Sequence, residues 1–94
     1  MQYKVYHAVE PTFGFGRTPK FPEEYKLVAL VECKDLEDVF RATNHITEDW
    51  TENPEVIDLY ANNIRSTSVG DVVEDENSVF NYCDHVGWKE LEVA

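Results

Sequence analysis

Apolar positions near the start of the chain follow two different patterns. Residues 2–9, QYKVYHAV, alternate and are rich in Tyr and Val, which predicts a half-buried strand. Residues 25–33, YKLVALVEC, include a continuous apolar run, which is typical of a central strand covered on both faces. Prolines and glycines follow closely on one another in residues 10–24. They predict a long loop between the two strands.

Residues 35–46, DLEDVFRATNHI, return to helical spacing. Asp35 is a good N-cap, and Asp38 stands three residues later in a weaker form of the capping box. Arg41 follows Glu37 by four positions, which favours an ion pair on the helix surface. We therefore expect one main helix over about 35–46.

The second half of the chain predicts a small β-meander. Residues 70–75, GDVVED, and 78–84, SVFNYCD, contain the β-branched and aromatic residues typical of strands. The polar pair Glu76–Asn77 between them indicates a hairpin. Residues 87–93, GWKELEV, predict a last strand. Residues 47–63 are harder to assign and predict a loop with a short helix or strand. The order predicts an α+β fold: one helix on a mostly antiparallel sheet of about four to five strands.

Length and composition fit one globular domain, residues 1–94. The chain is 43% hydrophobic and has 94 residues, which excludes a disordered chain. It lacks both an apolar run of about 20 residues and a secretory signal pattern, so we expect a cytoplasmic location. Cys33 and Cys83 are then expected to be buried free thiols.

The net charge of −11 is placed unevenly. Residues 1–41 have six Lys or Arg against seven acids, or −1, whereas residues 42–94 have two against twelve, or −10. This distribution argues against direct binding to nucleic acid or to an anionic membrane, since both need a positive surface. It favours either a partner with a basic surface or simple solubility.

The acidic residues form two groups along the sequence. Trp50 and Tyr60 lie among the acids of the first group, and the second group surrounds the predicted hairpin. Carboxylates interleaved with aromatics could imitate a phosphate backbone toward a basic groove, and the alternative is a solvated surface. We take as candidate partner-binding residues Glu48, Asp49, Glu52, Glu55, Asp58, Glu74, Asp75 and Glu76.

A second candidate surface is the loop FGFGRTPKF, residues 13–21. It lacks the spacing of a P-loop or a dinucleotide fingerprint. Aromatic and Arg side chains are nevertheless enriched in binding hot spots. The candidate residues are Phe13, Phe15, Arg17 and Lys20. The alternative is that the phenylalanines fold back over the sheet as a lid on the core.

Enzymatic and metal chemistry are weakly indicated. Cys83 and His85 could share one face of a strand, but no CxxC or HxxxH pair is present. Hydroxyl residues are common near Arg65, yet no nucleophile signature accompanies them. We expect no catalytic residue, metal or cofactor. An enzyme that uses His7, Cys83 and His85 is the least favoured hypothesis.

The stretch RSTSVGDVV, residues 65–73, is better explained by structure than by catalysis. Ser68 to Asp71 fits a β-turn with Gly70 at its third position, where a positive φ is tolerated. Arg65 is expected to tie acidic segments together. Residues expected to be structural are Arg65, Ser68, Gly70, Asp71 and Trp88.

The last third of the chain, RSTSVGDVVEDENSVFNYCDHVGWKEL, resembles the C-terminal signature of small proteins of phages, plasmids and conjugative elements, including YodL-like domains. The resemblance implies a mobile-element context and the cytoplasm of a microbial host. With the charge, it predicts a small accessory protein that acts by binding a protein, such as an inhibitor of a CRISPR or restriction nuclease. The alternative is a structural or regulatory module whose acidity serves solubility only.

Overall fold

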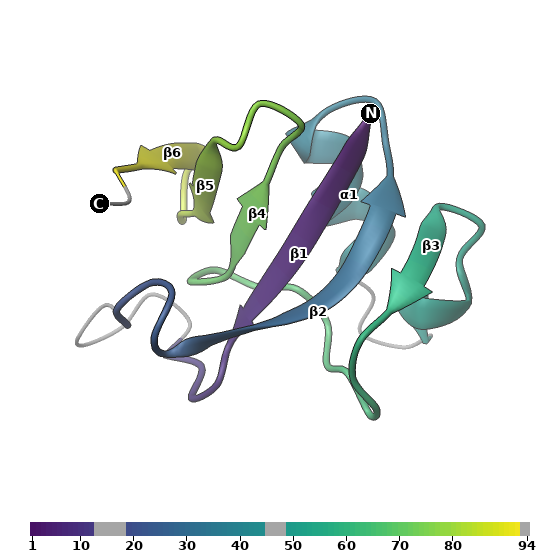
Figure 1. Cartoon of the computed structure of the whole chain (residues 1–94), viewed down its shortest axis with the longest axis horizontal. Coiled ribbons are helices and arrows are strands. Elements are labelled where there is room, and N and C mark those ends of the chain that lie inside the picture. The colour runs from purple at the N-terminus through teal and green to yellow at the C-terminus, as the bar shows by residue number, and fades with distance from the viewer. Residues whose placement is uncertain (13–18, 45–48, 93–94) are drawn as a thin grey trace.

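The computed structural model describes residues 1–12, 19–44 and 49–92. Within these residues six strands form one antiparallel sheet in the order β3-β2-β1-β4-β5-β6, with helix α1 on one face (Figure 1). The elements are β1 Gln2–Ala8, β2 Tyr25–Glu32, α1 Leu36–Thr43, a 3-10 helix η1 Trp50–Glu52, β3 Val56–Leu59, β4 Val72–Glu74, β5 Phe80–Cys83 and β6 Trp88–Leu91. The α+β prediction is confirmed, with six strands instead of four to five.

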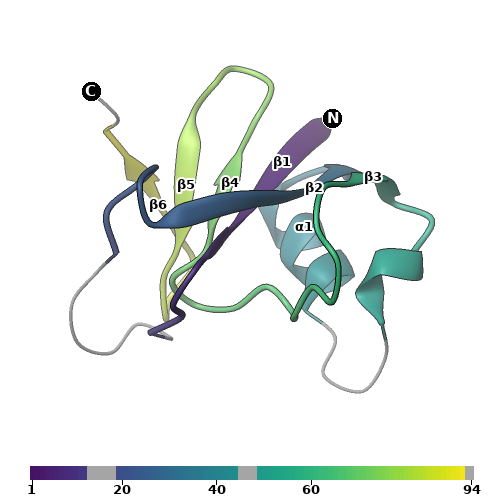
Figure 2. The same ribbon diagram turned by 60° about the horizontal axis from the view of Figure 1, so that its bottom comes forward.

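The main core lies between the sheet and α1. Tyr3 and Val5 of β1 pair in register with Val31 and Ala29 of β2, and Val5 also pairs with Val73 of β4. All of these side chains are buried on the α1 side, together with apolar residues of the helix. The alternation of β1 therefore places every second side chain in this core. Figure 2 shows α1 beneath the part of the sheet that β1, β2 and β3 form.

Helix α1 begins as the sequence predicts and ends earlier. The Asp35 carboxylate accepts the Asp38 N–H at 2.8 Å, so Asp35 is the N-cap. The helix stops at Thr43, where the Asn44 N–H still bonds to the Phe40 carbonyl, and residues 45–46 of the predicted helix lie outside the described residues.

The predicted ion pair of Arg41 with Glu37 is wrong. Arg41 instead contacts Asp38, three positions earlier, at 2.8 Å and Glu55 at 3.1 Å. The physical reason is that the first-turn carboxylate of Asp38 is already held by the Lys34 N–H. The Arg41 guanidinium contacts this fixed carboxylate and, at the same time, the carboxylate of Glu55 in the segment before β3.

A second, smaller core lies on the sheet face turned away from α1. Phe21 packs there with its ring centroid 5.2 Å from Tyr6, 5.3 Å from Tyr25 and 4.9 Å from Phe80. Aromatic rings at such distances pack in tilted or edge-on pairs. Part of the long loop therefore covers the sheet as a lid. Phe13 and Phe15, for which the same was considered, lie outside the described residues.

The described part of the segment 47–63, residues 49–63, contains both a short helix and a strand. Trp50 of η1 is 1% exposed and donates its Nε1–H to the Arg65 carbonyl at 2.8 Å, which anchors the segment to the core. Strand β3 then pairs with β2 at the edge of the sheet. The described part of the chain has no helix with the length and apolar character needed to cross a bilayer.

Candidate functional site

An ion pair between the half-buried Arg65 and the buried Asp71 lies at the centre of the RSTSVGDVV stretch. Asp71 is 1% exposed, and its Oδ2 and Oδ1 accept bonds from Nη1 and Nη2 of Arg65 at 2.7 and 2.8 Å. The carboxylate also accepts the backbone N–H groups of Ala8 at 3.0 Å and Ser68 at 2.8 Å. Arg65 Nη2 donates as well to the Ala8 carbonyl at 3.1 Å. The pair thereby joins the end of β1 to the turn before β4.

The turn itself has the predicted geometry. The Asp71 N–H donates to the Ser68 carbonyl at 3.1 Å, and Gly70 has φ +100°. The Gly70 carbonyl accepts the Tyr25 hydroxyl, and its N–H donates to the Cys83 carbonyl at 2.8 Å. A residue with positive φ is thus held between β2 and β5, which explains why glycine occupies this position.

His7 lies next to this pair and contacts Thr67. Its Nε2 is 2.9 Å from Thr67 Oγ1 and 3.9 Å from Asp71 Oδ2, and the side chain is 1% exposed. Burial lowers the pKa of His7 to about 4, although the Asp71 charge acts in the opposite direction. His7 is therefore neutral at pH 7. Its bond to Thr67 satisfies a buried polar pair.

Cys83 and His85 are not brought together with His7, whereas Thr67, one of the hydroxyl residues near Arg65, lies 2.9 Å from His7 Nε2. Cys83 and His85 line a hollow of about 190 Å³ beside Trp88, whereas His7 lines another hollow with Arg65 and Lys26. Within residues 1–12, 19–44 and 49–92, no three His, Cys, Asp or Glu side chains are grouped to hold a metal ion. Cys33 and Cys83 are buried free thiols. Burial raises the pKa of Cys33 to about 11 and that of Cys83 to about 12.

The first acidic group lies on η1, β3 and the residues beside them. Asp49, Glu52 and Asp58 are exposed, while Glu55 is half-buried and paired with Arg41. The Asp49 carboxylate also caps η1 by accepting the Thr51 N–H at 3.0 Å. Glu48 lies outside the described residues. Three exposed carboxylates of this group thus face solvent at one edge of the sheet.

The second acidic group, at the β4–β5 hairpin, has more structural contacts. Glu74 accepts the Tyr6 hydroxyl at 3.0 Å, and Asp75 accepts the N–H groups of Asn77 and Val79. Glu76 is exposed and accepts the Gln2 N–H at 3.0 Å. All three carboxylates therefore help to build the hairpin or its contact with β1.

Of the candidate residues in the loop 13–21, the structure describes Lys20. Lys20 is exposed, and its N–H donates to the Glu24 carboxylate at 2.6 Å. Phe13, Phe15 and Arg17 lie outside the described residues. Trp88 is half-buried and packs against the main core from β6.

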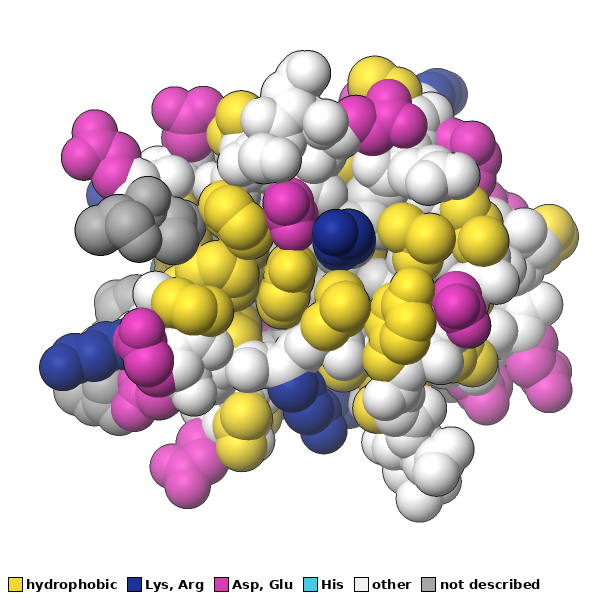
Figure 3. Space-filling view, viewed as in Figure 1, with side chains coloured by type: hydrophobic (Ala, Val, Ile, Leu, Met, Phe, Trp, Pro, Cys, Tyr) yellow, Lys and Arg dark blue, Asp and Glu magenta, His cyan; other side chains and the backbone are white. Residues whose placement is uncertain are grey.

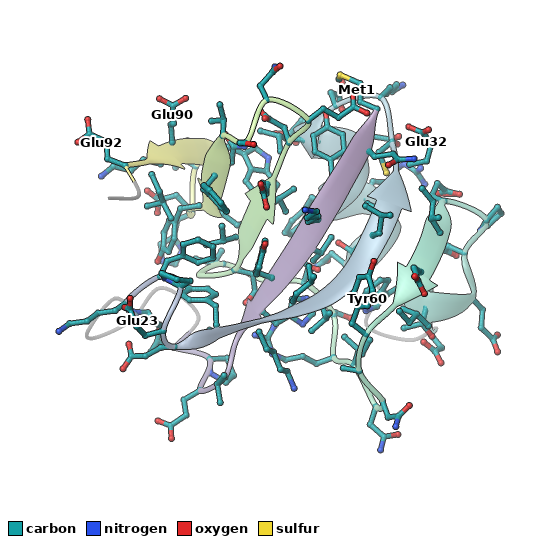
Figure 4. The ribbon with its side chains drawn as sticks, in the orientation of Figure 1. Met1, Glu23, Glu32, Tyr60, Glu90 and Glu92 are labelled. Carbon is teal, nitrogen blue, oxygen red and sulfur yellow. The ribbon has the colours of Figure 1, made fainter. Side chains whose placement is uncertain are left out.

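Sequence reasoning missed an exposed apolar surface at strand β3. Ile57, Leu59 and Tyr60 are 48%, 40% and 50% exposed. Figure 4 shows Tyr60 in front of β2, on the sheet face turned away from α1. On that same face, hydrophobic side chains form two groups with a basic and an acidic side chain between them, and carboxylates surround them (Figure 3). The sequence signal for this surface is the run VIDLY, residues 56–60, in which one polar residue, Asp58, interrupts the apolar residues.

Comparison with protein-family models, curated proteins and solved structures finds no match to this chain. The class of this protein is described by its fold: the described residues form a small α+β domain with an antiparallel sheet and one α-helix. The resemblance to mobile-element proteins stays a prediction.

Proposed function

We propose that this protein acts by binding a partner protein with a basic surface. The observation that carries the proposal is the charge of one edge of the molecule. Between residues 42 and 64 the chain has no Lys or Arg, and within that span Asp49, Glu52 and Asp58 are exposed. A surface of one sign steers an oppositely charged partner and discriminates against others.

The partner that we propose is a nucleic-acid-handling protein of a microbial host, such as a CRISPR or restriction nuclease. Its groove for nucleic acid is positively charged by necessity, because it neutralises phosphates. Exposed carboxylates on a small folded domain can compete for that groove. The proposed location is the cytoplasm of a cell that hosts a phage or another mobile element.

The direct experiment is affinity capture from a microbial host lysate, followed by measurement of the affinity for the purified captured protein. We expect binding to weaken at least about tenfold between about 50 mM and about 200 mM salt, because exposed charges are screened. Retention of no nucleic-acid-handling protein at low salt would contradict the proposal.

Charge-neutralising variants separate this proposal from the alternative that acidity serves solubility only. The test variant combines Asp49→Asn, Glu52→Gln and Asp58→Asn. The matched control removes three exposed carboxylates elsewhere, through Glu10→Gln, Glu23→Gln and Glu92→Gln.

Both triple variants have the same net charge, so they differ only in where the charge is lost. We expect the first to lose binding and the second to retain most of it. Equal losses in the two variants would mean that only overall charge matters. Equal retention would support solubility as the role of the acids.

A further inference from the structure

We propose that the open edge of β3 receives an extended strand from the partner, in which Lys or Arg alternates with apolar residues. The inference rests on the proposed function and specifies how the basic partner is bound. Strand β3 is at one end of the strand order, so one side of its backbone has no neighbouring strand among the described residues. Exposed sheet edges of this kind bind peptides by adding a strand.

The two edges of the sheet differ in their protection. Strand β6, at the other edge, includes Lys89, and a Lys on an edge strand discourages strand addition. Strand β3 has no Lys, and three of the large exposed hydrophobic residues lie at positions 57, 59 and 60. The edge at β3 therefore keeps an apolar character that the edge at β6 lacks.

The strand register shows that an apolar side chain and an acidic side chain of β3 lie on opposite faces of the sheet. Leu59 pairs with Ala29, whose side chain belongs to the core on the α1 side. Asp58 pairs with Leu30, which in turn pairs with Lys4, so Asp58 lies on the opposite face. Successive side chains of an added strand would alternate between the same two faces.

The α1 side of this edge offers some apolar contacts to the added strand. Leu59 lines a hollow of about 420 Å³ together with the apolar residues Trp50, Ala61 and Ile64. The other residues that line it are polar: Asp49, Thr51, Asn62, Asn63, Arg65 and Ser66. A branched apolar side chain placed beside Leu59 would enter this hollow and bury the exposed part of Leu59. Apolar residues are therefore required at every second position of the partner strand.

The opposite side of the edge favours a positive charge. Asp58 supplies a carboxylate there, and Tyr60 is exposed on the same face, where its ring can contact a cation (Figure 4). A second copy of this chain would instead place an acidic strand against Asp58, with a net charge of −11 on each copy. A basic partner strand fits this face, and self-pairing is opposed by repulsion.

Asp58 also explains how the edge is covered before the partner binds. The Tyr60 N–H points to β2, where it bonds to the Val28 carbonyl at 2.9 Å, so the Leu59 N–H points toward the open edge. Asp58 Oδ1 accepts this N–H at 3.0 Å. A Lys or Arg that pairs with the Asp58 carboxylate would release the Leu59 N–H to a carbonyl of the incoming strand.

The test uses the ¹⁵N-labelled full chain and three synthetic peptides of equal length. One alternates Lys and Val, one has the same composition with its Lys and Val residues in separate blocks, and one alternates Glu and Val. We expect the alternating Lys–Val peptide to shift the amide signals of Ile57 and Leu59 and to slow hydrogen exchange at Leu59. The blocked peptide should bind at least about fivefold more weakly, and the Glu–Val peptide should not bind.

Variants localise the effect. Leu59→Lys should weaken binding at least about tenfold, while Val86→Lys, which adds the same charge at another exposed apolar residue, should weaken it only slightly. Asp58→Asn should weaken it about threefold to tenfold, whereas Glu90→Gln on strand β6 should have little effect.

Other outcomes overturn the inference in distinguishable ways. If the two Lys peptides bind equally, or shift the signals of Glu32 and Glu76 and not those of β3, the edge assignment is wrong and the proposed function stands. If neither basic peptide binds at low salt, the proposed function is contradicted as well. A dimer by light scattering that Leu59→Lys dissociates would assign the edge to a second copy.

Discussion

Replacement of Arg65 by Ala is the change to which the fold should be most sensitive. Asp71 is 1% exposed, and its carboxylate accepts two bonds from the Arg65 guanidinium and two from backbone N–H groups. Removal of Arg65 leaves the buried carboxylate with the two N–H donors and no positive partner. Breaking a buried pair from one side costs about 3–5 kcal/mol.

We expect the lower end of that range for Arg65→Ala. Arg65 is 29% exposed, so water can partly replace its guanidinium, and the backbone donors of Ala8 and Ser68 remain. A loss of about 3 kcal/mol would lower the melting temperature of a domain of this size by about 12–20 °C. Arg65→Lys should recover only part of the loss, because Lys cannot donate to both carboxylate oxygens in the same geometry.

The assay is thermal and urea unfolding of Arg65→Ala, Asp71→Ala and the double variant. We expect strong coupling in this cycle, with the double variant less destabilised than the sum of the two single variants. Arg41→Ala is the control, since Arg41 is 61% exposed in its contacts with Asp38 and Glu55 and should matter much less. An unchanged melting temperature in Arg65→Ala, or additive losses, would refute the reasoning.

Three further predictions concern other buried positions of the domain. Because burial lowers the pKa of His7 from 6.5 to about 4, the unfolded chain binds the proton more readily, and stability should fall by up to about 3 kcal/mol between pH 7 and pH 4. His7→Gln should remove that part of the pH dependence in urea unfolding, and an identical slope in both proteins would contradict it. Gly70→Ala should cost about 1–2 kcal/mol in the same assay, because φ is +100°, and a neutral effect would show that the turn can adapt. Cys33 and Cys83 have raised pKa values of about 11 and 12, so iodoacetamide should label them at pH 8 only in denaturant, and rapid labelling of the native protein would count against their burial.

Much of the fold could be predicted from local patterns. The alternation of residues 2–9 and the apolar run in residues 25–33 correspond to β1 and β2, and Asp35 is the N-cap of α1. The hairpin and the turn at Gly70 also follow from local residue types. These elements share a strong local signal, because their buried faces or caps are determined within a few residues.

Strand β3 and the ion pair could not be predicted in the same way. Strand β3 lies at an edge and has no fully buried side chain, so it lacks the alternation of buried positions that identifies a strand. The sequence predicts that Arg65 ties acidic segments together. Among the described residues the structure shows one acidic partner, Asp71, six residues later, together with the carbonyl of Ser66 and that of Ala8 from β1. The contact to Ala8 depends on the pairing of distant strands, which no local pattern determines.

The most direct test of the central claim is a comparison of the two charge-neutralised triple variants in capture from a microbial host lysate at low salt. The account predicts that the variant of Asp49, Glu52 and Asp58 loses a nucleic-acid-handling protein that the wild type retains, whereas the variant of Glu10, Glu23 and Glu92 keeps it. Retention by both variants, or no such protein bound to the wild type, would contradict the account.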